Sequence, residues 1–446
     1  MNVRENDTDF HVKYNYSINY NDFNEILYSE KNVEKLKNVW IQWFDELENQ
    51  NKKTKYDFVQ QLSILDLEAE QNGAEELADY WLKDVDVTWI NYEKIKELWD
   101  GISPLYNKLK HFMISLIVQN YGTKVLEDGK FIPPHILGSV NSHDWVTAAE
   151  KLGAFDNLDI YKEIKSKLES KNFTELYEIA DNLTSELQIV LYEAMESFAK
   201  LRAIWPKNLQ KHEMLTSDNN KNDEKQKIFS LIVSGLDIIA SLPYYLVSDL
   251  WRINALQEID SAVAENAAEN VGETTITPTF SPMSNYTSGQ TYERTYGTTN
   301  LTADWWDYRK QYQGIGSPDG KFYEDYLLDS TIIWNKPYIS KFLGKLLQFQ
   351  ILENLESNNF SYSTINFAGL LRKGKSKPWQ VLVEETFNIT EISSKPLLKY
   401  FKPLEEYLDK GIKFKNQEHV FTTDEFNFVP QSLNSLNPTK KIYGNK

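Results

Sequence analysis

The chain is 446 residues long and carries 48 basic and 65 acidic side chains, a formal net charge of −17. A hydrophobic content of 41% excludes general disorder, and the length suffices for one large globular domain or for two to three ordinary ones. The acidic balance argues against nucleic acids and anionic membranes as partners, because phosphate surfaces repel such a charge. The lack of cysteine excludes disulfides, thiolate zinc sites and cysteine nucleophiles.

Signals for localisation point in different directions. Residues 1–7 lack the apolar core of a signal peptide, although a mature chain that has lost its signal would look the same. The lack of cysteine favours a reducing, cytoplasmic compartment. Asn-x-Ser/Thr sequons, for example at Asn6 and Asn388, favour secretion instead. The residues therefore leave localisation open.

Apolar residues recur with a helical period through most of the chain. Residues 1–30 are polar and rich in Asn and Tyr, which predicts an irregular N-terminal lead-in. From Val33 onward the spacing becomes i, i+3, i+4, i+7. Alternating strand patterns are scarce, so we predict a mainly α protein. Further helical patterns cover residues 56–70, 90–121, 158–170, 173–203, 224–252, 303–312, 335–357 and 395–410.

The most apolar stretch, Ile228–Trp251, invites comparison with a membrane span. It contains Asp237, Asp249 and Pro243. A charge near the centre of a spanning helix costs a few kcal/mol on insertion scales. We therefore interpret this stretch as a buried core helix and expect no membrane span.

Two stretches break the helical pattern. Residues 261–302 change from small and acidic side chains to Thr, Ser, Tyr and Gly, which predicts a long exposed insert. Residues 427–446 are polar and predict a flexible tail. We accordingly assign one helical domain to residues 31–426, with the insert inside it.

Residue spacing alone predicts no catalytic site. No two of the six histidines have the His-Glu-x-x-His spacing that places two zinc ligands on one helix face. His212–Thr216 comes closest, but a threonine stands where the second ligand is required. The chain also has no Gly-x-Ser-x-Gly elbow and no Gly-rich phosphate loop. Glu193 and Glu196 share a helix face, which in so acidic a chain is more often solvated than catalytic.

Several segments nevertheless resemble, in the same order, motifs of the angiotensin-converting enzyme family of zinc peptidyl-dipeptidases. Ile132–Gly138, with Trp145 following, resembles the family element IPAHLLG…W, and Asp304–Ile315 resembles DWW…YQGI. The resemblance runs from about Val33 to Phe414 and implies a single large helical ellipsoid with a central cleft. The other similar segments are Ile102–Gly122, Pro206–Leu209, Asp237–Trp251, Pro337–Gln350, Ser376–Trp379 and Leu397–Pro403.

The resemblance places the family's zinc site on positions that no longer suit zinc. Counting back from Pro206, Glu193 matches the third zinc ligand. The best match to the His-Glu-x-x-His helix is Tyr177–Asp181, which keeps the glutamate as Glu178 but neither histidine. Alternatively, the zinc helix is absent and this region belongs to something else. We expect zinc to be lost and no other cofactor, with Glu193 as a vestigial metal ligand and Glu178 as a vestigial catalytic residue.

The family's substrate-holding positions have changed as well. Tyr338 matches a tyrosine that binds the substrate's C-terminal carboxylate, and Lys341 stands at the family's transition-state tyrosine as a second vestigial catalytic candidate. Asp329 replaces a carboxylate-binding lysine, and Thr331 replaces a substrate-binding histidine. An aspartate at this position repels a carboxylate. The candidate ligand-binding residues are Tyr338, Asp329, Thr331 and His135.

Three functions are compatible with these patterns. The resemblance favours a pseudoenzyme that binds a peptide or protein partner through the retained cleft. The first alternative is a residual metallopeptidase with a metal site rebuilt from Glu178, Asp181 and Glu193, whose oxygen ligands suit harder metals than zinc. The second alternative is a structural or self-associating protein whose aromatic residues serve a core or an interface.

Overall fold

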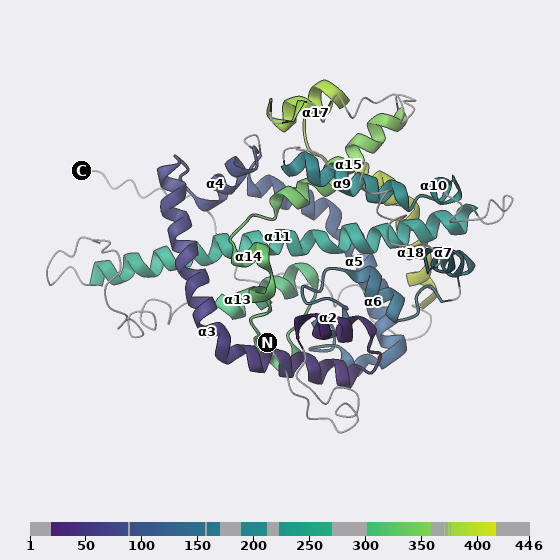
Figure 1. The fold of residues 1–446 in the computed structure, drawn as a ribbon, viewed down its shortest axis with the longest axis horizontal. Coiled ribbons are helices and arrows are strands. Elements are labelled where there is room, and N and C mark those ends of the chain that lie inside the picture. Colours follow the sequence, from purple (N-terminus) through teal and green to yellow (C-terminus); the bar gives the residue numbers. More distant parts are fainter. Residues whose placement is uncertain are drawn as a thin grey trace.

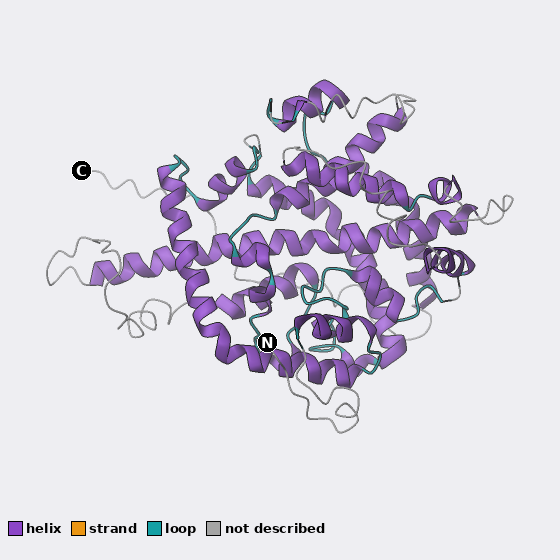
Figure 2. Cartoon of the chain, viewed as in Figure 1, coloured by secondary structure: helices purple, strands orange, loops and turns teal. Residues whose placement is uncertain are grey.

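The protein is built from α-helices joined by loops (Figure 2). No β-strand occurs in the part of the chain that the structure describes, where only two isolated β-bridges are found. The prediction of a mainly α protein is confirmed. The structure is a computed structural model that describes residues 19–87, 90–156, 158–169, 189–211, 223–269, 301–357, 370, 373–374 and 376–415.

The described helices follow the order of the predicted helical patterns (Figure 1). Short 3-10 turns, η2 (Pro134–Ile136) and η6 (Asp325–Leu328), and a π-helical turn, η4 (Arg309–Gln313), connect some of them. The α-helices are α2 (Tyr20–Ser29), α3 (Val33–Gln71), α4 (Leu77–Asp84), α5 (Tyr92–Tyr121), α6 (Trp145–Lys151), α7 (Asp159–Glu169), α9 (Ile189–Ala203), α10 (Pro206–Lys211), α11 (Asp223–Glu269), α13 (Leu301–Tyr308), α14 (Ser330–Ile333), α15 (Ile339–Ser357), α17 (Trp379–Phe387) and α18 (Lys395–Lys415).

Helix α11 runs through the middle of the molecule, with α9 and α15 on one side of it and α13 on the other in the view of Figure 1. It packs against α3, α5, α6, α13, α15 and α18. In the described chain, one helix, Glu224–Gln257, is long and apolar enough to cross a membrane, but 89% of its apolar window is buried inside the protein. Such burial is typical of a core helix, as predicted for this stretch.

The N-terminal lead-in is helical where the structure describes it, so its prediction as irregular is wrong for α2. Asn19 caps α2 by accepting hydrogen bonds from the backbone N–H groups of Asn21 and Asp22, and the Asp22 side chain accepts one in return. Phe23 stacks on Trp43 of α3, with ring centroids 4.4 Å apart. The polar composition concealed this short apolar face. Residues 1–18 lie outside the described residues.

Helix α11 also extends farther than predicted. It ends at Glu269, inside the predicted insert 261–302, because its alanine-rich end has a high helix propensity. Leu301 and Thr302, at the other end of the predicted insert, are buried in α13. The insert boundaries were therefore wrong at both ends. Residues 270–300 and the predicted tail 427–446 lie outside the described residues.

Candidate functional site

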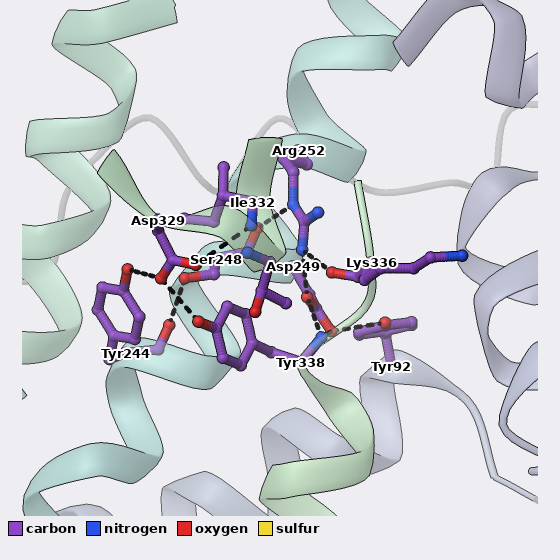
Figure 3. A network of polar contacts seen from close by, with 10 residues as sticks. Tyr92, Tyr244, Ser248, Asp249, Arg252, Asp329, Ile332, Lys336 and Tyr338 are labelled. Carbon is purple, nitrogen blue, oxygen red and sulfur yellow. Dashed lines mark hydrogen bonds and ion pairs between the residues drawn. The ribbon is translucent and has the colours of Figure 1, made fainter. Parts of the chain in front are cut away.

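Asp329 is the centre of a buried hydrogen-bond network between α11, α14 and α15 (Figure 3). It is the N-cap of α14, and its Oδ1 accepts from the backbone N–H groups of Thr331 at 2.8 Å and Ile332 at 3.3 Å. Its Oδ2 accepts from the hydroxyls of Tyr244 and Tyr338, both at 2.6 Å. Both carboxylate oxygens are thus engaged by the chain itself.

The two tyrosines remain hydrogen-bond donors throughout the physiological pH range. Burial and the charge of Asp329 raise the pKa of Tyr244 and of Tyr338 above the usual value for tyrosine. Asn141 adds a third donor to the same oxygen, with 3.0 Å between its Nδ2 and Oδ2 of Asp329. Neutral donors therefore stabilise a carboxylate that is only 4% exposed.

A second buried carboxylate, Asp249 of α11, holds the backbone of Tyr338 in place (Figure 3). Its Oδ1 accepts from the Tyr338 backbone N–H at 2.8 Å, and its Oδ2 accepts from the Tyr92 hydroxyl at 3.0 Å. Nη2 of Arg252 donates both to Asp249 Oδ1 and to the backbone carbonyl of Lys336. Burial raises the pKa of Asp249, although Arg252 opposes this shift. The pair ties the loop between α14 and α15 to the central helix.

Three of the four predicted ligand-binding residues come together in this network. Tyr338 and Asp329 are hydrogen-bonded to each other, and Thr331 contributes its backbone N–H to the same carboxylate. Tyr338 is only 4% exposed. The hydroxyl that a ligand's carboxylate would need is therefore already used inside the protein.

The fourth predicted ligand-binding residue, His135, lies elsewhere. It belongs to η2, which packs against α3, and its exposed fraction is 1%. Neither ring nitrogen has a hydrogen-bond partner among the described residues. Burial lowers the pKa of His135 to about 3, so the ring is neutral. The structure does not support the prediction that His135 contacts a ligand, because the ring is part of the core.

Glu193, the vestigial zinc ligand, lies where α9 packs against α15. Gly344 of α15 makes this contact close, since a Cβ at that position would lie 2.6 Å from the Cβ of Glu193. Burial raises the pKa of Glu193, while the positive charges of Lys341 and Lys345 act in the opposite direction. The structure thus brings Glu193 and the vestigial catalytic candidate Lys341 together.

These surroundings do not fit a catalytic zinc ion, which needs three protein ligands and an open position for water. The described residues contain no group of three or more His, Cys, Asp or Glu side chains that could hold a metal ion. The ammonium groups of Lys341 and Lys345 also oppose a cation beside Glu193. Glu178 and His212–Thr216 lie outside the described residues and are not placed relative to this site.

Sequence reasoning missed the partners of Asp329 and a histidine beside them. Tyr244 lies in Asp237–Trp251, one of the segments that resemble the family. The helical period of this segment does not reveal that the Tyr244 hydroxyl faces Asp329. Asn141 and His143 follow another such motif closely. The ring of His143 stacks on Tyr244 with 4.9 Å between centroids, and its Nδ1 is buried without a hydrogen-bond partner in the described structure.

Three cavities lined by described residues lie away from this network. One of about 230 Å³ lies among α11, α15 and α18, and two others of about 190 and 180 Å³ lie beside α6 and α7. None of these three is lined by Tyr338, Asp329, Glu193 or Lys341. The central cleft implied by the resemblance stays a prediction.

Comparison with known proteins shows the class to which this helical fold belongs, the M2 peptidases. The sequence profile of this family, described as angiotensin-converting enzyme, matches residues 6–191 and 290–420. The chain therefore belongs to the angiotensin-converting enzyme family. Residues 192–289, which include Glu193 and helix α11, fall between the two matched parts.

The relatives are distant in sequence. An angiotensin-converting enzyme-like protein of Mus musculus is 22% identical over 482 residues, which cover 87% of this chain and 60% of the mouse protein. The angiotensin-converting enzyme of Theromyzon tessulatum is 22% identical over 87% of this chain and 72% of its own length. That of Oryctolagus cuniculus is 20% identical over 87% of this chain and 34% of its own. The chain thus spans less than two thirds of the mouse and rabbit proteins.

Proposed function

We propose that this chain is a non-hydrolytic member of the angiotensin-converting enzyme family that binds a peptide or protein partner. The contact between Asp329 and Tyr338 carries the proposal. By resemblance, Tyr338 would anchor the C-terminal carboxylate of a peptide substrate, yet its hydroxyl donates to Asp329 at 2.6 Å. A substrate carboxylate would have to displace a buried group of the same charge, which opposes the binding of dipeptidase substrates.

The surroundings of Glu193 support the same proposal. Zinc peptidases attack with a metal-bound water whose pKa is lowered to about 7. Glu193 has Glu196 and three lysines around it, and the described residues supply no set of three metal ligands. A single carboxylate cannot hold zinc tightly at neutral pH. We therefore expect hydrolysis to be lost completely.

The binding role rests on the scaffold and on its charged surface. The partly or fully exposed side chains on α9, α11 and α15 include Glu193, Glu196, Asp237, Lys341 and Lys345. They offer polar contacts to a peptide or protein. The net charge of −17 makes nucleic acid an unfavourable partner.

Zinc content and dipeptide release test the loss of hydrolysis. Protein purified without chelators is analysed for metals and is then incubated with a peptide substrate, with and without added zinc. We expect no stoichiometric zinc and no release of C-terminal dipeptides. One equivalent of zinc together with chelator-sensitive release would contradict the proposal and favour the residual metallopeptidase.

A pull-down from the native source tests the binding role. We expect to capture a peptide or protein, and we expect an excess of the untagged chain to prevent its capture. Recovery of the chain alone, together with concentration-dependent self-association in solution, would favour the structural alternative.

A further inference from the structure

Helix α15 carries two lysines next to the Tyr338 network that form no ion pair with any acidic residue the structure describes. Lys341 and Lys345 are four residues apart and therefore lie on one face of the helix. Within the described part of the chain, no carboxylate oxygen lies within 4 Å of either ammonium group. Like charges at this spacing repel each other, and among the described residues the carboxylates that offset this repulsion lie beyond 4 Å.

Partial burial increases the cost of this arrangement. Both lysines are partly exposed, and burial lowers the pKa of Lys345 even though the charges of Asp237 and Glu193 act against the shift. Lys200 of α9 is different, because it forms an ion pair with Glu196 at 2.7 Å. A desolvated ammonium group without a close partner gains from contact with an anion.

Tyr338 and His143 lie beside the lysine pair, and neither competes with the two ammonium groups for an anion. Nζ of Lys341 lies 5.2 Å from the ring centroid of Tyr338. The Tyr338 hydroxyl is engaged by Asp329, so it has no hydrogen to offer a second carboxylate. His143 is affected by the charge of Lys341, and its buried Nδ1 has no partner among the described residues.

Acidic groups near the lysines restrict the kind of anion that fits. Glu193 and Asp237 both act electrostatically on Lys345. Lys341, Lys345 and Lys200 are balanced by Glu193, Glu196 and Asp237, so the local net charge is close to zero. A group with a single negative charge can contact the lysines, whereas a polyanion is repelled by the carboxylates.

We propose that Lys341 and Lys345 form a binding site for one carboxylate group of a peptide ligand. This lysine site lies on α15, which begins directly after Tyr338, and it replaces the tyrosine anchor whose hydroxyl donates to Asp329. The carboxylate comes from the peptide's C-terminus or from an Asp or Glu side chain. The inference deepens the proposed function and rests on it for the peptide nature of the ligand.

Three small probes test the lysine site in the full chain. They are N-acetyl-glycylglycine, its C-terminal amide, and N-acetyl-aspartate amide, with binding measured by isothermal titration calorimetry. We expect carboxylate probes to bind at least tenfold more tightly than the neutral amide. Binding of N-acetyl-glycylglycine alone assigns the C-terminus as the source, and binding of the aspartate probe assigns a side chain. Equal binding of all three probes, or of none, would overturn the proposal.

Lysine variants locate the site. Lys341→Met and Lys345→Met should each weaken carboxylate binding about tenfold, as expected for a lost charge-assisted contact. Lys399→Met is the matched control and should keep the affinity, because Lys399 pairs with Glu353 at 2.7 Å and is not among the charges that act on Lys345. Lys345→Arg keeps the charge and should keep binding, and circular dichroism checks that each variant is folded. Unchanged affinity in both methionine variants would contradict the site.

Failure of this inference and failure of the proposed function are distinguishable. Zinc content and dipeptide release are measured without reference to the lysines. Loss of carboxylate binding with no hydrolysis rejects only the lysine site, and hydrolysis with lysine-dependent binding rejects only the non-hydrolytic role.

Discussion

Asp329 and the lysine pair on α15 lie close together but represent opposite ways of placing charge in a helical protein. Asp329 is buried and accepts hydrogen bonds from Tyr244, Tyr338 and two backbone N–H groups. Lys341 and Lys345 have no acidic group within 4 Å in the described chain. The hydrogen bonds of the Asp329 carboxylate are all made within the protein. The two ammonium groups can still bind the carboxylate that we propose as their ligand. We therefore propose that Tyr338 does not anchor a ligand's carboxylate here, because its hydroxyl already donates to Asp329.

Of the predicted effects on the stability of the fold, the removal of the Asp329 carboxylate should be the largest. Asp329→Ala leaves the Tyr244 and Tyr338 hydroxyls without their acceptor and removes the cap of α14. We expect the free energy of unfolding to fall by about 3–5 kcal/mol, measured by urea denaturation.

Asp329→Asn is the matched control for this substitution. Asparagine retains a capping oxygen for α14 but brings an amide group toward the tyrosines, so the expected loss is smaller. A loss below about 1 kcal/mol in Asp329→Ala would show that the network does not stabilise the fold.

Widening the contact between α9 and α15 should have the next largest effect. A Cβ at Gly344 would lie 2.6 Å from Glu193 Cβ and 2.9 Å from the Ala194 backbone nitrogen. Gly344→Ala should therefore destabilise the protein by up to about 3 kcal/mol, despite the better helix propensity of alanine. Gly411→Ala in α18 meets nothing within 4 Å and should stabilise it by about 0.5–1 kcal/mol. Equal effects in the two variants would contradict the close contact.

His135 extends the comparison to a buried polar group that has no hydrogen-bond partner among the described residues. Its folded-state pKa of about 3 lies below the usual value, so the unfolded chain takes up a proton at a higher pH than the folded chain. Stability should therefore decrease as the pH falls from about 6.5 towards 3, by about 2 kcal/mol between pH 7 and 5.

The non-titrating variant His135→Leu isolates this contribution. Urea denaturation at pH 7 and 5 should show a smaller loss of stability in the variant than in the wild-type chain. Parallel pH dependence of the two proteins would mean that His135 is not buried in its neutral form.

Removing one lysine of the pair should have the smallest effect on stability. Lys345→Met deletes a partly buried charge that has no described carboxylate within 4 Å, so we expect a change within about 1 kcal/mol, of either sign. The same urea titration as for Asp329→Ala gives the measurement. A loss as large as that of Asp329→Ala would show that Lys345 is a structural partner of Glu193 or Asp237 and not a free contact.

The fold was predictable from the sequence to a considerable extent. The long helix α11 followed from its long, mostly apolar run, and family membership followed from motifs in a fixed order. Helix α2 was missed because its few apolar residues stand in a polar segment and become buried only against Trp43 of α3. The end of α11 was missed because helix propensity there acts without an apolar face.

Sequence by itself determined the helical class, the central core helix and the family. Helical period and motif order depend only on the order of residues along the chain, so they can be recognised without the tertiary structure. It also brought Tyr338, Asp329 and Thr331 to notice as neighbouring candidates. Only the tertiary structure decided that Asp329 accepts from Tyr338 and Tyr244 and that His135 is core. It also decided that Lys341 and Lys345 form no ion pair with the described acidic residues. The physical reason is that the helical period tells which residues share a face, whereas the packing of α11, α14 and α15 decides what that face meets.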